Sequence, residues 1–272
     1  MKRSLIFLLP LLLAFGAGIA GCSQDGKLKA LNAEVESLYR KGQYDRAVTV
    51  AEKALEVAEE AVGPDHPDLA TSLNNRAVLY YTQGQYAQAE PLYQRSLAIR
   101  EKVLGLDHPD VAESLNNLAA LYEKQGKYGQ IELLYKRSLA IREKALGQDH
   151  PDVASSLSNL AELYRTLHQY AQAEPLYKRS LAIWEKALGP DHPDVAVSLN
   201  NLGCLYCNQR QYEKAEPLFK RSLAIREKAL GPDHPDVAVA LENLAELYRT
   251  TNRAEECEAL LIRADAIRAI KR

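Results

Sequence analysis

The sequence Asp-His-Pro-Asp occurs five times, and its carboxylate and imidazole side chains are of the kinds that bind metals or transfer protons in catalysis. Five copies could form a row of metal sites or of catalytic acids. Alternatively, the motif marks the boundaries between structural units. The copies begin at Asp65, Asp107, Asp149, Asp191 and Asp233.

The spacing of the copies argues against metal binding and catalysis by this motif. Successive copies begin 42 residues apart, so each belongs to a different unit. Neighbouring helices pack roughly 8–10 Å apart, whereas two histidines on one zinc need ring nitrogens within roughly 4 Å of each other. One loop alone supplies too few ligands, and no nucleophile accompanies it. The sequence therefore predicts neither a metal nor a catalytic residue in these loops.

The neighbours of the motif indicate a helix boundary. A glycine stands two residues before each copy, and glycine is favoured just after a helix end. Proline suits the first turn of the next helix, so the preceding histidine falls at the N-cap or one residue earlier. We expect the flanking aspartates to cap free backbone N–H groups.

Apolar residues between the motifs follow a helical period. In one unit Val111, Leu115, Leu118 and Tyr122 share a helical face, and a second helix begins near Tyr128. Each unit is therefore predicted to be a helical hairpin that cannot bury its apolar face alone and stacks on its neighbours. Between the two helices, each unit has one turn residue at the same place in the 42-residue period, and we call such a set of equivalent positions a column. This turn column contains Gly42, Gly84, Gly126, His168, Arg210 and Asn252.

The repeated pattern resembles the tetratricopeptide repeat in its 42-residue form, which is typical of kinesin light chains and their bacterial relatives. Ala119, Gly126, Tyr128 and Tyr135, with the Leu and Tyr columns between them, carry this resemblance, which spans residues 28–270. It implies an all-α fold, a right-handed superhelical solenoid of stacked antiparallel helical hairpins. The array 28–272 then divides into six hairpins at about 28–67, 68–109, 110–151, 152–193, 194–235 and 236–272.

The N-terminus has the layout of a secretory signal. Two basic residues precede an interrupted apolar run from Leu5 to Ile19 that is too short for a comfortable membrane span. The segment ends in Ile-Ala-Gly-Cys and resembles a bacterial lipoprotein signal. That resemblance implies that residues 1–21 are removed and that Cys22 is lipidated, with residues 22–27 forming a short linker.

The residue after Cys22 is Ser23 rather than Asp, which within the lipoprotein family favours the outer membrane, facing the periplasm. Alternatives are an ordinary signal peptide with a chance cysteine, giving a secreted or periplasmic protein, and an uncleaved anchor. The net charge of the 272-residue chain is −2, so no basic surplus points to nucleic acid. We expect no cofactor and no small-molecule substrate.

One polar column recurs in the first helix of five units. Asparagine is a middling helix former, so propensity does not explain it. Amides can bond the donors and acceptors of an extended peptide, and the family resemblance implies this role. Alternatively, each Asn bonds a neighbouring helix and fixes the stacking of the repeats. The column contains Asn75, Asn117, Asn159, Asn201 and Asn243, beside a partial column of Asn74, Asn116, Ser158, Asn200 and Glu242.

Positions that differ from unit to unit, while the packing positions stay the same, are the predicted source of binding specificity. One turn after the asparagines come Tyr81, Glu123, Arg165, Cys207 and Arg249, which predict a groove of mixed charge. Some members of the family that the chain resembles hold a C-terminal carboxylate with a basic clamp, which would need lysines one turn before the asparagines. The absence of these lysines disfavours binding of chaperone tails. Those positions hold Thr71, Glu113, Ser155, Val197 and Val239.

Two features depart from their columns. Trp184 replaces an arginine found in other units, either as an exposed contact point or packed flat over a neighbouring helix. Cys204 and Cys207 form a Cys-x-x-Cys pair in the middle of a predicted helix. Redox-active pairs of this spacing instead place the first cysteine at a helix N-terminus, which lowers the pKa of its thiol. In an oxidising compartment the two could still close a disulfide.

These features favour a non-enzymatic, lipid-anchored scaffold whose concave groove binds a peptide or protein partner. The alternative is a structural component of a larger cell-envelope assembly that packs through its convex face and Trp184. A remote alternative is thiol–disulfide exchange through Cys204 and Cys207.

Overall fold

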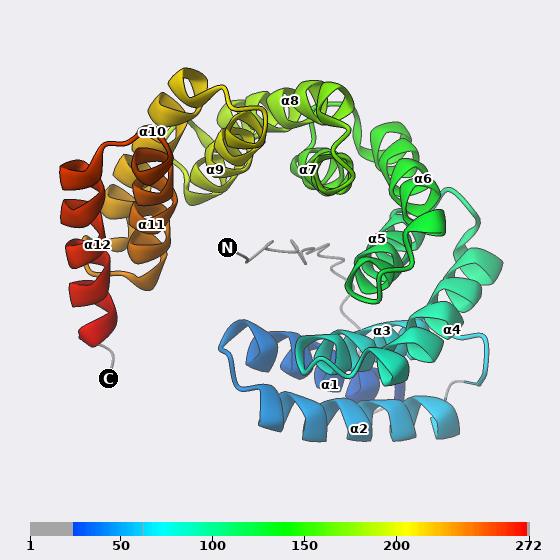
Figure 1. The fold of residues 1–272 in the computed structure, drawn as a ribbon. Helices are drawn as coiled ribbons and strands as arrows, with labels where there is room; N and C mark the ends of the chain where they lie inside the picture. Colours follow the sequence, from blue (N-terminus) through cyan, green and yellow to red (C-terminus); the bar gives the residue numbers. More distant parts are fainter. Residues whose placement is uncertain (1–23, 62, 271–272) are drawn as a thin grey trace. The chain divides into compact units, whose positions relative to one another are not determined.

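The computed structural model describes residues 24–61 and 63–270, which form twelve α-helices and no β-strand (Figure 1). The predicted lipidation site, Cys22, lies outside the described residues. The helices are α1 (Gln24–Arg40), α2 (Tyr44–Ala61), α3 (Pro67–Thr82), α4 (Tyr86–Leu104), α5 (Pro109–Lys124), α6 (Tyr128–Leu146), α7 (Pro151–Thr166), α8 (Tyr170–Leu188), α9 (Pro193–Asn208), α10 (Tyr212–Leu230), α11 (Pro235–Thr250) and α12 (Ala254–Ala269).

The described residues form two compact units. The N-terminal unit ends at Ala145 and holds the hairpins α1–α2, α3–α4 and α5–α6. The C-terminal unit begins at Leu146 and holds α7–α8, α9–α10 and α11–α12. The predicted helical hairpins are confirmed.

Within each unit the hairpins stack in a regular way. A second helix packs against its own first helix and against the first helix of the following hairpin, as α4 does with α3 and α5. First helices also contact one another, α3 with α1 and α5, and α7 with α9. In each unit the first helices therefore form one layer and the second helices the other (Figure 1). We call the solvent side of the first-helix layer the first-helix face.

The Asp-His-Pro-Asp motifs start the first helices, as predicted. In each copy from α3 to α11 the histidine is the N-cap and has extended backbone, and the proline begins the helix. The expectation that the aspartates supply the cap is wrong, because the imidazole does so. Nδ1 of His108, for example, accepts from the backbone N–H of Asp110 at 3.2 Å.

In four of the five copies, the first aspartate of the motif instead joins the start of the first helix to the end of the second helix of its hairpin. Asp107, before α5, binds the Nζ of Lys144 at the end of α6, and this hydrogen bond lowers the pKa of Asp107. The same pair recurs as Asp65 with Lys102, Asp149 with Lys186 and Asp191 with Lys228.

The turns inside the hairpins all adopt left-handed backbone. Gly84 and Gly126 have φ of 76° and 71°, and the side-chain-bearing residues at the same position follow them. His168, Arg210 and Asn252 have φ of 59°, 60° and 59°. Left-handed backbone is costly for residues other than glycine, so the later hairpins carry local strain at this turn.

We expect Arg210→Gly to raise the free energy of unfolding by about 0.5–1 kcal/mol, because glycine removes the strain at positive φ. The matched change Gly126→Ala should lower it by about 1 kcal/mol. A Cβ at Gly126 meets no atom within 4 Å, so backbone strain alone is measured there. Urea denaturation of the two variants checks this, and a loss of stability in Arg210→Gly would contradict it.

One helical glycine is explained by a neighbouring ring. Gly203 occupies a column that holds alanine in the other hairpins from Ala77 onward, and a Cβ there would lie 2.7 Å from Cε1 of Phe219. Phe219 in turn replaces the tyrosine of Tyr135 and Tyr177. The ring of Phe219 therefore fills the space that the missing methyl group leaves.

Candidate functional site

The asparagine column lies between hairpins of the same unit. Asn117 Nδ2 donates to Asn74 Oδ1 at 3.0 Å, and Asn243 Nδ2 donates to Asn200 Oδ1 at 2.7 Å. These bonds favour the stacking alternative for Asn117 and Asn243, while a peptide-binding role of the column stays a prediction. Asn116 and Asn117 are buried, and Asn75, Asn159, Asn200, Asn201 and Asn243 are half-buried.

Asn75 breaks this pattern. Its Nδ2 is buried and has no hydrogen-bond partner among the described residues. In the preceding hairpin the counterpart of Asn74 is Asn32, whose Oδ1 accepts from the Oγ of Ser72 at 3.0 Å. Asn117 donates to the amide oxygen of Asn74, but the equivalent oxygen for Asn75, that of Asn32, already accepts from Ser72.

The predicted groove arginines both pair with glutamates on their own helices. Arg165 on α7 donates to Glu162 through Nε at 2.8 Å and Nη2 at 2.5 Å. The buried Tyr177 donates its hydroxyl to the same carboxylate at 2.6 Å. Hydrogen bonding to Glu162 raises the pKa of Arg165. Arg249 repeats the pair with Glu246 at 2.6 Å on α11, where both side chains are exposed.

Between these two ion pairs, α9 presents an uncharged surface. Asp194 in its first turn is the one charged residue of this helix. We call the half-buried residues on its first-helix face the α9 strip. The strip comprises Val197, Asn200, Asn201, Cys204 and Cys207.

The first-helix face of the N-terminal unit has a different character. Glu36, Glu113 and Glu123 are half-buried there, beside Tyr39 and Tyr81. Burial raises the pKa values of Glu36 and Tyr81. The two units therefore offer distinct chemistry, acidic and aromatic in the first, uncharged with flanking ion pairs in the second.

The cysteines of the α9 strip are poorly suited to thiol exchange. Burial raises the pKa of Cys204 to about 11 and that of Cys207 to about 12, whereas a reactive thiol needs a lowered pKa. Both thiols are free, as is that of the buried Cys257. This geometry disfavours the thiol–disulfide hypothesis.

We expect these raised pKa values to make the chain less stable above pH 9. Between about pH 9 and pH 11 the unfolded chain loses thiol protons that the folded chain retains, so unfolding becomes more favourable as pH rises. The free energy of unfolding should fall by about 1 kcal/mol or more from this cause. Urea denaturation at several pH values should show a shallower fall in Cys204→Ala/Cys207→Ser. An equal fall in both proteins would contradict the assignment.

Trp184 is buried, with an exposed fraction of 5%. Its counterpart Arg100 is also buried and docks the following hairpin through Nη1, which donates to Asp110 O and Ser114 Oγ, each at 2.9 Å. The possibility that Trp184 is an exposed contact point is therefore wrong, because its column lies in the interface between helices. An assembly that packs through Trp184 would need this interface to open.

Within residues 24–61 and 63–270, no group of three or more His, Cys, Asp or Glu side chains could hold a metal ion. In the same ranges, no helix is both long and apolar enough to cross a membrane.

Stacked helical hairpins with a variable, half-buried face define a class of repeat proteins that present extended binding surfaces. The chain belongs to the tetratricopeptide repeat family. The family profile matches residues 28–102, 73–144, 110–184, 152–228 and 205–268. Such repeats generally mediate interactions between proteins.

Solved structures of similar proteins agree with this assignment. The nearly identical TPR-like repeats of a Podosopora anserina protein described as a kinesin light chain are 29% identical, with a TM-score of 0.65, over 76% of this chain and 98% of that chain. BtubC (BKLC) from P. vanneervenii is 24% identical, with a TM-score of 0.67, over 92% and 93% of the two chains. PilW, a type IV pilus biogenesis factor, is 18% identical, with a TM-score of 0.64, over 86% and 90%. The last two show the fold alone.

Proposed function

We propose that this chain is a non-enzymatic scaffold, tethered to the bacterial outer membrane by a lipid on Cys22 and facing the periplasm, that binds a peptide or protein segment on its first-helix face. The observation that carries the binding proposal is the contrast between the packing positions and the half-buried positions of the first-helix face. Packing positions repeat from hairpin to hairpin, while the half-buried residues of the face change. In one column these are Tyr81, Glu123, Arg165 and Cys207.

The α9 strip is the best-suited part of the face for an uncharged segment of the partner. Its thiols and Val197 favour an apolar contact, and the amide of Asn201 offers hydrogen bonds to a peptide backbone. Glu162 with Arg165 and Glu246 with Arg249 border the strip. A partner with charges in the middle of its segment would leave them desolvated against this strip.

Photo-crosslinking in cells tests the binding proposal. A photoreactive amino acid placed at Asn208 or Thr250, both exposed at the ends of first helices, should capture a defined protein. The same probe at Lys178 or Lys220, exposed on second helices, is the control. Capture of one protein only from the first-helix positions supports the proposal. Capture of the same protein equally from both sets would instead support a component that packs into a larger assembly.

A further inference from the structure

Among the described residues, α12 leaves exposed a face that the other second helices bury. Leu261 on α12 is 41% exposed, whereas its counterparts Tyr177 and Phe219 are 1% and 3% exposed. Those counterparts are buried because a following first helix packs on them, as α9 packs on α8 and α11 on α10. Ile262 beside Leu261 is 64% exposed, in a column that holds Glu, Gln or Lys in the other hairpins.

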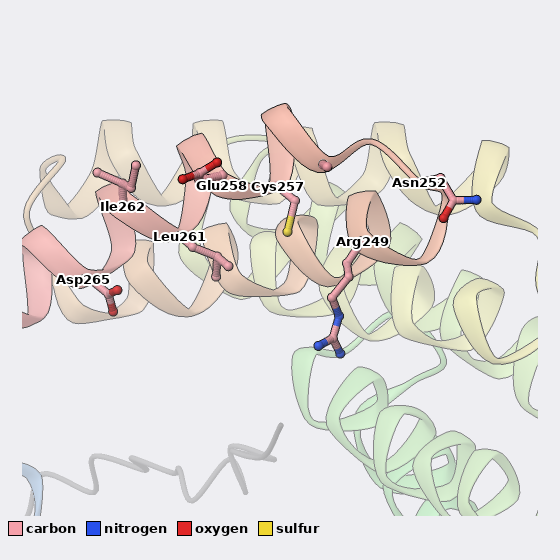
Figure 2. A pocket seen from close by; sticks show the side chains of 8 residues that line it. Arg249, Asn252, Cys257, Glu258, Leu261, Ile262 and Asp265 are labelled. Carbon is pink, nitrogen blue, oxygen red and sulfur yellow. The ribbon is translucent and has the colours of Figure 1, made fainter.

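The exposed stripe on α12 has acids at both ends. Glu258, Leu261, Ile262 and Asp265 follow helical spacing and line a cavity of about 400 Å³ beside Arg249 (Figure 2). Among the described residues neither acid forms an ion pair, whereas the arginines of α12 do. Arg263 pairs with Glu227 and Arg268 with Glu242. We call the surface formed by Glu258, Leu261, Ile262 and Asp265 the end face. It has an apolar centre with a negative charge on each side that is unpaired within the described part of the chain.

In other hairpins, where the equivalent face is covered, the glutamate at the position of Glu258 pairs with a basic side chain. Glu216, the counterpart of Glu258, accepts from Arg253 Nη1 at 2.9 Å and from the hydroxyl of Tyr248 at 3.1 Å. In the N-terminal unit, Glu90 accepts from Lys127 Nζ at 2.8 Å. At both positions a basic group comes from the hairpin that covers the face.

A second copy of this chain is a poor occupant of the end face. The outer side of its α1 carries Lys27, Glu34 and Ser37 where α5 carries Val111, Leu118 and Leu121, so it offers polar groups to an apolar stripe. Two α12 helices paired about a two-fold axis centred on Leu261 and Ile262 would oppose Glu258 to Asp265 of the other copy. Like charges in this arrangement repel.

We propose that the end face of α12 binds an amphipathic helix of a partner protein in which adjacent apolar residues are flanked on both sides by Lys or Arg. The helix takes the place of a following first helix. Its apolar residues cover Leu261 and Ile262, and its basic residues pair with Glu258 and Asp265. This site is separate from the first-helix face, so it adds a second contact to the proposed scaffold.

A peptide derived from α11 tests the end face, because α11 covers the equivalent face of α10. The probe is a stapled, fluorescein-labelled peptide of residues 235–253 with Val237→Lys. It retains Arg253 to meet Glu258. Val237 packs with Leu223, the counterpart of Asp265, so the new lysine should meet Asp265. Fluorescence anisotropy with the chain from residue 24 onward should give a Kd of about 100 µM or tighter.

Variants of the exposed stripe separate recognition from folding. Glu258→Lys/Asp265→Lys should weaken binding at least about tenfold and should favour a charge-reversed peptide with Val237→Glu and Arg253→Glu. Ile262→Gln should also weaken binding, whereas Glu255→Lys, a charge reversal elsewhere on α12, should not. Circular dichroism checks that the variants fold.

Three results would overturn the proposal: no binding at about 1 mM peptide, equal binding by the charge-reversal variant, or a dimer that Ile262→Gln dissociates. Changes in the α9 strip should leave this binding intact, so the end face and the first-helix face can fail independently.

Discussion

Trp184→Ala is expected to lower the free energy of unfolding of the C-terminal unit by about 3–5 kcal/mol. The indole is 5% exposed and fills a column that docks one hairpin on the next. Its removal leaves a cavity in that interface, because the surrounding helices relax only in part. Urea denaturation followed by circular dichroism measures the loss.

Trp184→Arg is the matched comparison, since arginine occupies this column in other hairpins. Arg226 donates there to Asp236 O at 2.9 Å. We expect this variant to lose less stability than Trp184→Ala, because a guanidinium has a backbone acceptor within reach. Unchanged stability of Trp184→Ala together with loss of a binding partner would show that the side chain is a contact residue after all.

The second large effect is expected at the membrane. Cys22→Ala should abolish incorporation of a labelled fatty acid and release the chain from the envelope membranes into the soluble fraction. A covalent acyl chain contributes about 0.8 kcal/mol for each buried CH₂ group, and stable anchoring needs more than one chain. Loss of the acylated residue should therefore remove the attachment completely. Metabolic labelling and membrane fractionation measure both results.

Cys204→Ala is the control for the lipidation test, since it removes a thiol of the α9 strip and leaves the Ile-Ala-Gly-Cys segment unchanged. It should retain both label and membrane attachment. Membrane attachment of Cys22→Ala without label would contradict the lipoprotein proposal and favour an uncleaved anchor.

Much of the fold could be predicted because the 42-residue period fixes the element order. The Gly-x-Asp-His-Pro-Asp segment places a helix end and a helix start in one loop, and both are where the sequence indicated. Which side chain caps the helix could not be predicted. Asp and His are adjacent in the motif and both kinds of side chain can cap a helix; in the structure His108 accepts from the backbone N–H of Asp110, while Asp107 pairs with Lys144.

The candidate site was harder to predict, because the asparagines lie at the border between two surfaces. A helical pattern places Asn117 beside the buried stripe, but the closeness of the next hairpin decides whether its amide meets Asn74 or a ligand. Trp184 shows the same limit, since its column looks charged and exposed until the stacking is known. The exposed face of α12 does leave a signal in the sequence, because Ile262 is apolar where other hairpins have Glu, Gln or Lys.

The most direct test of the central claim is the affinity of the crosslinked partner for two repeat-swap variants. Val197→Glu/Cys207→Arg changes the α9 strip to residues that the same columns already carry at Glu113 and Arg165. Glu213→Ala/Lys220→Gln makes an equivalent exchange on the second helix of that hairpin. Isothermal titration calorimetry should show a loss of at least about tenfold only in the first variant. Equal affinities for both variants and the unmodified chain would contradict recognition on the first-helix face.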